Sequence, residues 1–399
     1  MAITRVAARW QVRFFGTSPS GIRPADAAFY ADANGQSLDA FVFVDGSDTN
    51  RFPATDASDE PGGDAENRLT QLEVQTIINE ALGIANQSRA QIRVPVGSQA
   101  RVTISVVDTQ GTILGMARTR DGPVFGSDVS LQKARTATFF SGTGLQGSVA
   151  PADFLRSMPE PLYLSPLAEP VNLSQLRTLA NPAPSLSGYV AALQLFLGLP
   201  GALESSGNVV AFSDRAGGNL SRPNYPDGPD NGPPGPLSKP EGEWSIFSSG
   251  LQLDLVYNAI INHVAFVLGL APEVPQNCVG NTGFAVSDAF TSVNTQSNLA
   301  NGIQIFPGSV PIFRGDVLIG GIGVSGDGVD QDDMIAFLGI HRAGLRLGSN
   351  KRIPAPGNAP RELRADQLEI PGQSSRLRYV NCPQAPFIDS DETEICSGL

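Results

Sequence analysis

The chain has 399 residues, a formal net charge of −12 and only two histidines. This acidic balance argues against a surface for nucleic acid or for anionic membranes, because no cluster of Lys and Arg offsets it. No run of about 18 apolar residues occurs, so we expect no membrane span. At this length two or three domains are expected. A chain of this size can bury a large core, so its stability need not come from the three cysteines.

The cysteines and the composition favour an exported protein. Cys382 and Cys396 flank a short polar loop that a disulfide could close, while Cys278 is as readily bonded as free. The opening residues lack the charged and apolar regions of a signal peptide. Gly, Pro, Asn and Ser are abundant and lysines are few, which is typical of export. We therefore expect a periplasmic or extracellular location.

The first part of the chain, residues 1–67, is expected to be a β-rich lead-in. Residues 9–15 and 38–44 have the pattern of strands, and the Asn34-Gly35 dipeptide predicts a hairpin turn. Residues 54–64 are acidic and contain Gly and Pro, so a solvated linker is expected there.

A helix and a hairpin follow. Thr70 and Glu73 have the spacing of a capping box, and apolar residues then recur at helical spacing up to Ala85, which predicts an amphipathic helix of about five turns. Residues 102–108 and 113–118 predict two strands. Their connection is too short for a crossover, so they must be antiparallel. A helix over 128–140 has a small-residue face for close packing on the sheet.

The rest of the chain contains further predicted strands and helices, separated by segments without a regular pattern. Strands are expected at 302–306, 309–313 and 317–324, and a helix at 334–340, which together with the first part gives an antiparallel sheet covered by helices, an α+β fold. Between the two parts, helices are expected at 187–199 and 251–268, the latter deeply buried. The Pro-rich segment 222–240 is expected to be an ordered covering loop, with disorder as the alternative. In the C-terminal part, residues 379–383 are candidates for an edge strand.

Three motifs indicate a family. They are Val106-Val-Asp108 with Gly111, Lys133-Ala-Arg135-Thr-Ala, and Pro311-Ile followed by Gly320-Gly-Ile-Gly323-Val-Ser-Gly326 and Asp332-Asp333. Together they resemble the GlcG/HbpS family of small α+β domains, over 69–142 and 300–340. The resemblance implies an oligomer, haem binding in several members and an accessory role beside redox or degradative enzymes, with no settled reaction.

The resemblance also divides the chain. We expect the lead-in at 1–67, a GlcG/HbpS-like core made of 68–145 and 300–345, an insertion at 146–299 and an extended tail at 346–399. The glycines at 320–326 do not precede the helix of a dinucleotide-binding unit, and more plausibly allow close backbone approach in a kinked strand.

Candidate ligand-binding residues are few. Haem iron usually takes His, Met, Cys or Tyr, which makes His263 and His341 the candidates, although a core or exposed histidine is the plainer interpretation of each. Lys133, Arg135 and Arg118 are the groups we expect to hold a small anion or a haem propionate. The alternative for them is an ion pair with a nearby aspartate.

An acidic loop offers a second kind of site. Hard cations such as calcium take six to eight oxygen ligands. The acidic residues that crowd this loop are candidates for such ligands, with helix N-capping as the alternative: Asp327, Asp330, Asp332 and Asp333. A second oxygen-rich group lies between Asp32 and Asp48. No Gly-x-Ser-x-Gly elbow and no setting for a catalytic triad is found.

These observations support three hypotheses for function. The first is an exported, non-catalytic protein that binds haem or another small ligand, as an accessory to a redox assembly. The second is a structural protein that forms oligomers without a cofactor. The third is an enzyme whose site lies between core and insertion, where pockets tend to form.

Overall fold

The computed structural model describes residues 21–141, 162–164, 180–182, 186–204, 209–221, 235–238, 251–252, 264–270, 272, 304–348 and 353–399. The strand expected at 9–15, the centre of the helix at 251–268, nearly all of the covering loop, His263 and Cys278 lie outside these residues. Within them, no helix is both long and apolar enough to cross a membrane.

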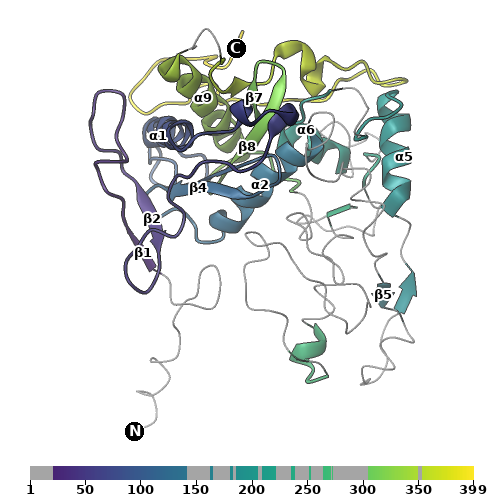
Figure 1. Cartoon of the computed structure of the whole chain (residues 1–399), viewed down its shortest axis with the longest axis horizontal. Coiled ribbons are helices and arrows are strands. Elements are labelled where there is room, and N and C mark those ends of the chain that lie inside the picture. Colours follow the sequence, from purple (N-terminus) through teal and green to yellow (C-terminus); the bar gives the residue numbers. More distant parts are fainter. Residues whose placement is uncertain are drawn as a thin grey trace.

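A seven-stranded antiparallel sheet forms the centre of the molecule (Figure 1), with strand order β1-β2-β4-β3-β8-β7-β9. Its strands are β1 (Gly21–Pro24), β2 (Phe41–Val44), β3 (Thr103–Val107), β4 (Ile113–Arg118), β7 (Ser309–Arg314), β8 (Val317–Ser325) and β9 (Gly357–Asn358). A separate pair joins β5 (Leu162–Leu164) to β6 (Ala180–Pro182). The α+β fold class expected from the sequence is confirmed.

One pairing joins the two halves of the predicted core. β3 lies antiparallel to β8, in a register that runs from Thr103 opposite Ser325 to Val107 opposite Gly321. Strands that are about two hundred positions apart in the chain are therefore hydrogen-bonded neighbours. The expectation of one continuous sheet is met, whereas the exact boundaries of the four parts stay a prediction.

Helices cover both faces of this sheet (Figure 1). α1 (Gln71–Gln87) packs against α9 (Val329–Leu347) on one face, and α2 (Gly126–Phe140) packs on β3, β7 and β8 from the other. α5 (Leu186–Leu197) and α6 (Asp214–Ser221) belong to the inserted region, and α6 contacts α2. The capping box is present, because the Glu73 backbone N–H donates to the Thr70 hydroxyl and the Thr70 N–H donates to the Glu73 carboxylate.

Glycines in β8 allow α2 to lie directly on the sheet. A Cβ at Gly323 would lie 2.5 Å from the backbone nitrogen of Ala134, and one at Gly321 would lie 2.7 Å from the carbonyl oxygen of Ala134. Real Cβ atoms do not come this close to backbone, so only glycine is compatible with this packing. The structural interpretation of the glycine run is therefore the right one.

Several expectations for individual segments are wrong. Residues 54–64 are not a solvated linker, because Ala54, Ala57 and Asp59 are buried and the N–H of Ala57 donates to the carbonyl of Leu69. Residues 304–306 form no strand, although 309–313 and 317–324 do. The helix at 334–340 is longer than expected, since it spans the whole of α9.

Two further corrections concern exposed and edge segments. The C-terminal end of the helix expected at 251–268 is not deeply buried, since Val264, Phe266 and Val267 are exposed, whereas Leu251 at its start is buried. The residues at 379–383 do not form an edge strand. The edge next to β7 is instead the short β9, in which Asn358 pairs with Ile312.

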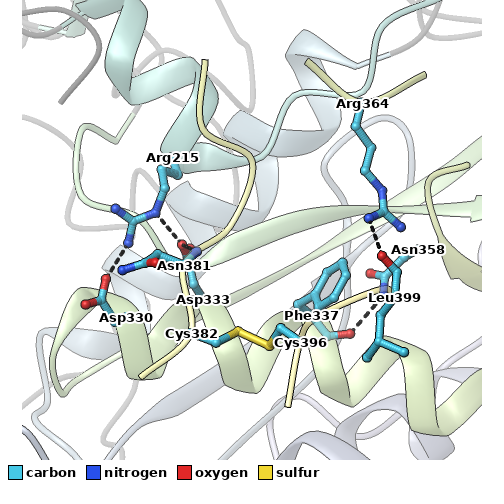
Figure 2. Close-up of a disulfide and its surroundings, with 10 residues drawn as sticks. All are labelled: Arg215, Asp330, Asp333, Phe337, Asn358, Arg364, Asn381, Cys382, Cys396 and Leu399. Carbon is cyan, nitrogen blue, oxygen red and sulfur yellow. Dashed lines mark hydrogen bonds and ion pairs between the residues drawn. A yellow bond between two sulfur atoms is a disulfide. The ribbon is translucent and has the colours of Figure 1, made fainter. Parts of the chain in front are cut away.

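The C-terminal tail runs along α9 and is attached to it by several contacts (Figure 2). Cys382 and Cys396 form a disulfide. The backbone N–H of Asn381 donates to Asp333 of α9 over 3.0 Å. The guanidinium of Arg364 lies 5.2 Å from the ring centre of Phe337 and donates to the carbonyl of Leu399 over 2.8 Å. The tail is therefore an integral part of the described fold.

Candidate functional site: a pocket above a buried ion pair

Lys133 and Asp332 form a buried ion pair between α2 and the first turn of α9. Their side chains are each 2% exposed, and the Lys133 Nζ lies 3.0 Å from the Asp332 Oδ2. The same Nζ donates to the carbonyl oxygen of Val324 over 2.9 Å. An ammonium group has three N–H donors, so one more is left for another acceptor.

The chain around this pair leaves no room for a side chain. A Cβ at Gly308 would lie 2.7 Å from the Lys133 Nζ and 2.8 Å from the Asp332 Cβ. The φ of Gly308 is +139°, in the region that favours glycine. Gly308 therefore allows the pair to form directly beneath the loop that enters β7.

A pocket of about 530 Å³ opens above the pair, between the start of α2, the end of β8 and the start of α9. This volume lies in the range of ordinary small-molecule sites. Apolar side chains form most of its wall, with a smaller number of polar groups. The lining residues are Ile92, Phe125, Val129, Lys133, Gln304, Phe306, Ser325, Gly326, Asp327, Val329 and Asp332.

The rim of the pocket is apolar and open. Ile92 is 65% exposed and Phe125 is 64% exposed, which is unusual for side chains of this size. On the same side, the Asp327 carboxylate accepts the backbone N–H of Gln91 and pairs with Arg93 over 3.2 Å. Asp327 thus attaches the loop that carries Ile92 to the end of β8.

Burial sets the electrostatics of the pocket floor. It raises the pKa of Asp332, and the attraction to Lys133 opposes this effect. Removing two charges from water is costly, and a buried pair is compensated only while both partners are present. The pocket floor is therefore polar and the pocket wall mostly apolar. The stability of the floor depends on both Lys133 and Asp332.

The two other predicted cations lie away from this pocket. Arg135 of α2 is buried and donates from its Nε to the carbonyl of Gly111 over 2.7 Å, at the turn between β3 and β4. Burial lowers the pKa of Arg135 to about 9, against the attraction of Asp108 and Asp128. Arg118, at the end of β4, is 3% exposed, and its guanidinium lies 5.5 Å from the ring centre of Phe43.

His341 is not among the residues that line the pocket. His341 lies in the C-terminal half of α9 and is partly buried; burial and the charge of Arg342 lower its pKa. His263 lies outside the described residues. None of the described lining residues is a histidine, methionine, cysteine or tyrosine.

The acidic residues expected in a loop lie mostly at the start of helix α9, which contains Asp330, Asp332 and Asp333, and they form ion pairs with basic side chains (Figure 2). Arg215 of α6 lies 2.5 Å from Asp333 and 2.7 Å from Asp330, while Asp327 and Asp332 have the partners given above. Burial raises the pKa of Asp333 to about 6, although Arg215 opposes this. Among the described residues, no group of three or more His, Cys, Asp or Glu could hold a metal ion. Calcium binding stays a prediction, without a ligand group in this part of the chain.

Reasoning from the sequence missed most of the pocket wall. Phe125 and Val129 lie at the start of α2, outside the motifs that indicate the family, and the sequence pattern predicts a strand at Phe306. Ile92 comes from a loop that had no assigned role. A large exposed aromatic directly before a helix, as at Phe125, is the one local signal that could have identified the rim.

Asp108 gives a test of the local electrostatics. Its carboxylate accepts the backbone N–H groups of Gln110 and Thr112. Burial, followed by the charge of Asp59, raises its pKa from 3.8 to about 6. The native state therefore binds the proton more tightly than the unfolded chain, so stability falls as the pH rises from about 4 to about 6 and stays lower above that range.

We expect Asp108→Asn to be more stable than the wild type at pH 7.5, by about 1–2 kcal/mol, with a limit of about 3 kcal/mol from the difference in pKa. The difference should nearly vanish near pH 3, where the wild-type carboxyl is mostly protonated in both states. Urea unfolding at both pH values measures it. Asp45→Asn is the matched control. Like Asp108, Asp45 accepts the backbone N–H groups of the residues two and four positions later, which are Ser47 and Thr49, but here the backbone hydrogen bonds lower the pKa of the carboxyl. A gain in the control, or none at Asp108, would contradict the assignment.

One family model matches a part of the chain. Residues 275–341 match the model of a family described as haem degrading protein HbpS-like. The matched segment includes β7, β8 and the first two thirds of α9. The HbpS-like resemblance inferred from the sequence is therefore confirmed, and this segment supplies Asp327, Asp332 and the Gly-rich strand of the site.

Two other comparisons add less. No curated protein matches the chain. Among solved structures, the crystal structure of a PduOC:haem complex is similar at 14% identity, covering 69% of this chain and 94% of the other, with a TM-score of 0.27.

Proposed function

We propose that this protein is a non-catalytic binding protein whose pocket takes a flat, apolar ligand that carries an acidic group, and that haem is the first candidate. The observation that carries the proposal is the buried Lys133–Asp332 pair at the floor of an otherwise apolar pocket. Such a site holds the apolar body by burial and the acidic group by the remaining N–H donor of Lys133.

The HbpS-like match supports haem as the candidate, and the residues present determine how haem would bind. Phe125, Phe306 and Val329 suit the faces of a macrocycle, and Lys133 suits a propionate. No described lining residue offers an axial ligand of the usual kind. Within the described part of the chain, the lining residues therefore suit the ring of haem and its acidic edge, and none of them suits the iron.

Titration with haemin tests this proposal. The Soret band should shift and saturate at one haem per chain, without the spectrum of an iron bound by histidine. The double variant Lys133→Met/Asp332→Leu, which removes the polar floor and keeps the pocket apolar, should bind at least tenfold more weakly. Arg376→Met, which removes an exposed cation of the tail, is the control and should bind like the wild type. A spectrum of free haemin with the wild type would end the haem hypothesis.

An oxidising location is part of the same proposal. The Cys382–Cys396 disulfide supports export, because structural disulfides persist outside the reducing cytosol. An accessory role beside a redox protein is also proposed, and rests on the family resemblance alone.

An oligomer-forming interaction protein is the second candidate function. Its support is the apolar tip of the loop at 89–99, where Val94 and Val96 are about nine-tenths exposed beside Ile92 at the pocket rim. Light scattering should then give a mass of two or more chains, and Val94→Asp/Val96→Asp should lower it. A monomer at every concentration would exclude this candidate without affecting the first.

A further inference from the structure

Arg118 is buried but has no hydrogen-bonding partner in the described part of the chain. Its side chain is 3% exposed, and neither its Nε nor its Nη1 meets an acceptor. Asp121, the carboxylate whose charge acts on it most, does not form an ion pair with it within the described residues. Burial accordingly lowers the pKa of Arg118. An uncompensated buried charge of this kind is costly, and buried cations in proteins are normally paired.

Arg118 is one of two arginines that stack on a pair of phenylalanines. Phe41 and Phe43 are two positions apart in β2 and therefore share one face of the sheet. The Arg118 guanidinium lies 5.5 Å from the centre of the Phe43 ring, and the Arg120 guanidinium lies 5.1 Å from that of Phe41. Arg120 is 59% exposed and pairs with Asp39 over 3.2 Å. The exposed guanidinium of Arg120 and the buried guanidinium of Arg118 therefore lie over neighbouring phenylalanines.

This arrangement is not part of the pocket above Lys133. Arg118 lies on β4, and β3 separates β4 from β8, which forms the edge of that pocket. None of Arg118, Arg120, Phe41 and Phe43 lines it. Stacking on an aromatic ring engages the face of a guanidinium, and the N–H donors along its edge stay free for an acceptor that lies beside the ring. A planar fork of donors matches the two oxygens of a carboxylate or phosphate.

We propose that Arg118 is the central group of a second site, which binds the oxyanion of a small carboxylate or phosphate ligand, with Arg120 as its exposed arm. The anion would supply the acceptors that the described residues do not provide to the Nε and Nη1 of Arg118. The site holds its charge at a cost in stability that binding offsets.

Calorimetric titration with sodium phosphate and with sodium malonate, at constant ionic strength against chloride, tests the proposal. We expect saturable binding of at least one of the two anions. Arg118→Met should abolish that binding and, because it removes an unpaired buried charge, raise the melting temperature of the protein without anion. Arg118→Lys, which keeps the charge without the fork, should bind at least tenfold more weakly.

The controls separate this site from general electrostatics. Arg120→Gln should weaken binding severalfold, whereas Arg23→Gln, which removes an exposed arginine of β1, should leave it unchanged. Phosphate alone or malonate alone would identify the ligand class. Equal binding by wild type and Arg118→Met, or a response that chloride reproduces, would overturn the proposal. Haemin binding at the Lys133 pocket is measured in a separate experiment. A negative result for one site therefore does not affect the test of the other site.

Discussion

Replacing Lys133 with methionine is expected to lower the free energy of unfolding by about 3–5 kcal/mol, because it leaves Asp332 buried without its counter-charge. The Asp332 side chain is 2% exposed, so water at the pocket floor replaces the ammonium group only in part. Its pKa is already raised by burial and would rise further once Lys133 no longer opposes this effect. Urea unfolding at pH 7.5 measures the loss. Lowering the pH should recover part of it, because protonation neutralises the isolated carboxyl.

The double variant Lys133→Met/Asp332→Leu separates stability from binding. Replacement of a whole buried ion pair by apolar side chains of similar size is often neutral or stabilising. We therefore expect the double variant to unfold within about 1 kcal/mol of the wild type, and the coupling energy of the cycle to be about 3 kcal/mol or more. Additive losses at the two positions would mean that the pair does not form in solution. Ligand binding should stay weak in the double variant although its stability is restored.

Replacing Gly323 with alanine is the second change with a large expected effect. The added methyl group would meet the backbone of α2 at Ser130 and Ala134, with 2.5 Å to the Ala134 nitrogen. Backbone cannot rotate away as a side chain can, so α2 must move off the sheet. Overpacking in a core costs about 1–3 kcal/mol and occasionally more. We expect a loss at the upper end of this range, measured as a fall in the melting temperature and in the free energy of unfolding.

Gly83→Ala is the matched control for this packing. Gly83 lies in the middle of α1, where a Cβ would find only the Leu38 side chain at 3.9 Å. This is ordinary contact, so the higher helix propensity of alanine should raise stability by about 0.5–1 kcal/mol. If both variants lose the same amount, close approach of α2 to β8 is not the reason that Gly323 is needed.

Much of the core fold could be predicted because its signals are local. Thr70 and Glu73 define the start of α1 within four residues, and the helical spacing of the following apolar residues predicts its length. The short turn at 109–111 requires β3 and β4 to be antiparallel, as they are. In each case the residues that decide the structure lie within a few positions of one another.

Segments stabilised by distant partners were predicted less well. The segment at 54–64 has the composition of a linker, but Thr55 donates its N–H to Leu114 of β4 and Ala57 to Leu69. The tail near Tyr379 has the pattern of a strand, yet it packs on α9, where Asn381 bonds to Asp333. Acceptors contributed by remote parts of the chain have no signature in the local sequence.

The site was half predictable for the same reason. Lysine is rare in this chain, so the sequence singles out Lys133 and allows an aspartate as its partner. The wall of the pocket was not predictable, because Phe125, Phe306 and Ile92 come from three separate segments that meet only after β3 pairs with β8.

By itself the amino-acid sequence determined the fold class, the family resemblance and the set of charged groups available, since periodicity, capping and turn length act over short distances. Only the tertiary structure decided what each charge does. Lys133 and Arg215 are paired with carboxylates of α9, whereas Arg118 is buried beside Phe43 and forms no ion pair with any residue that the structure describes. The physical reason is that a buried charge is defined by its neighbours in space, and those neighbours are up to about two hundred residues away in the chain.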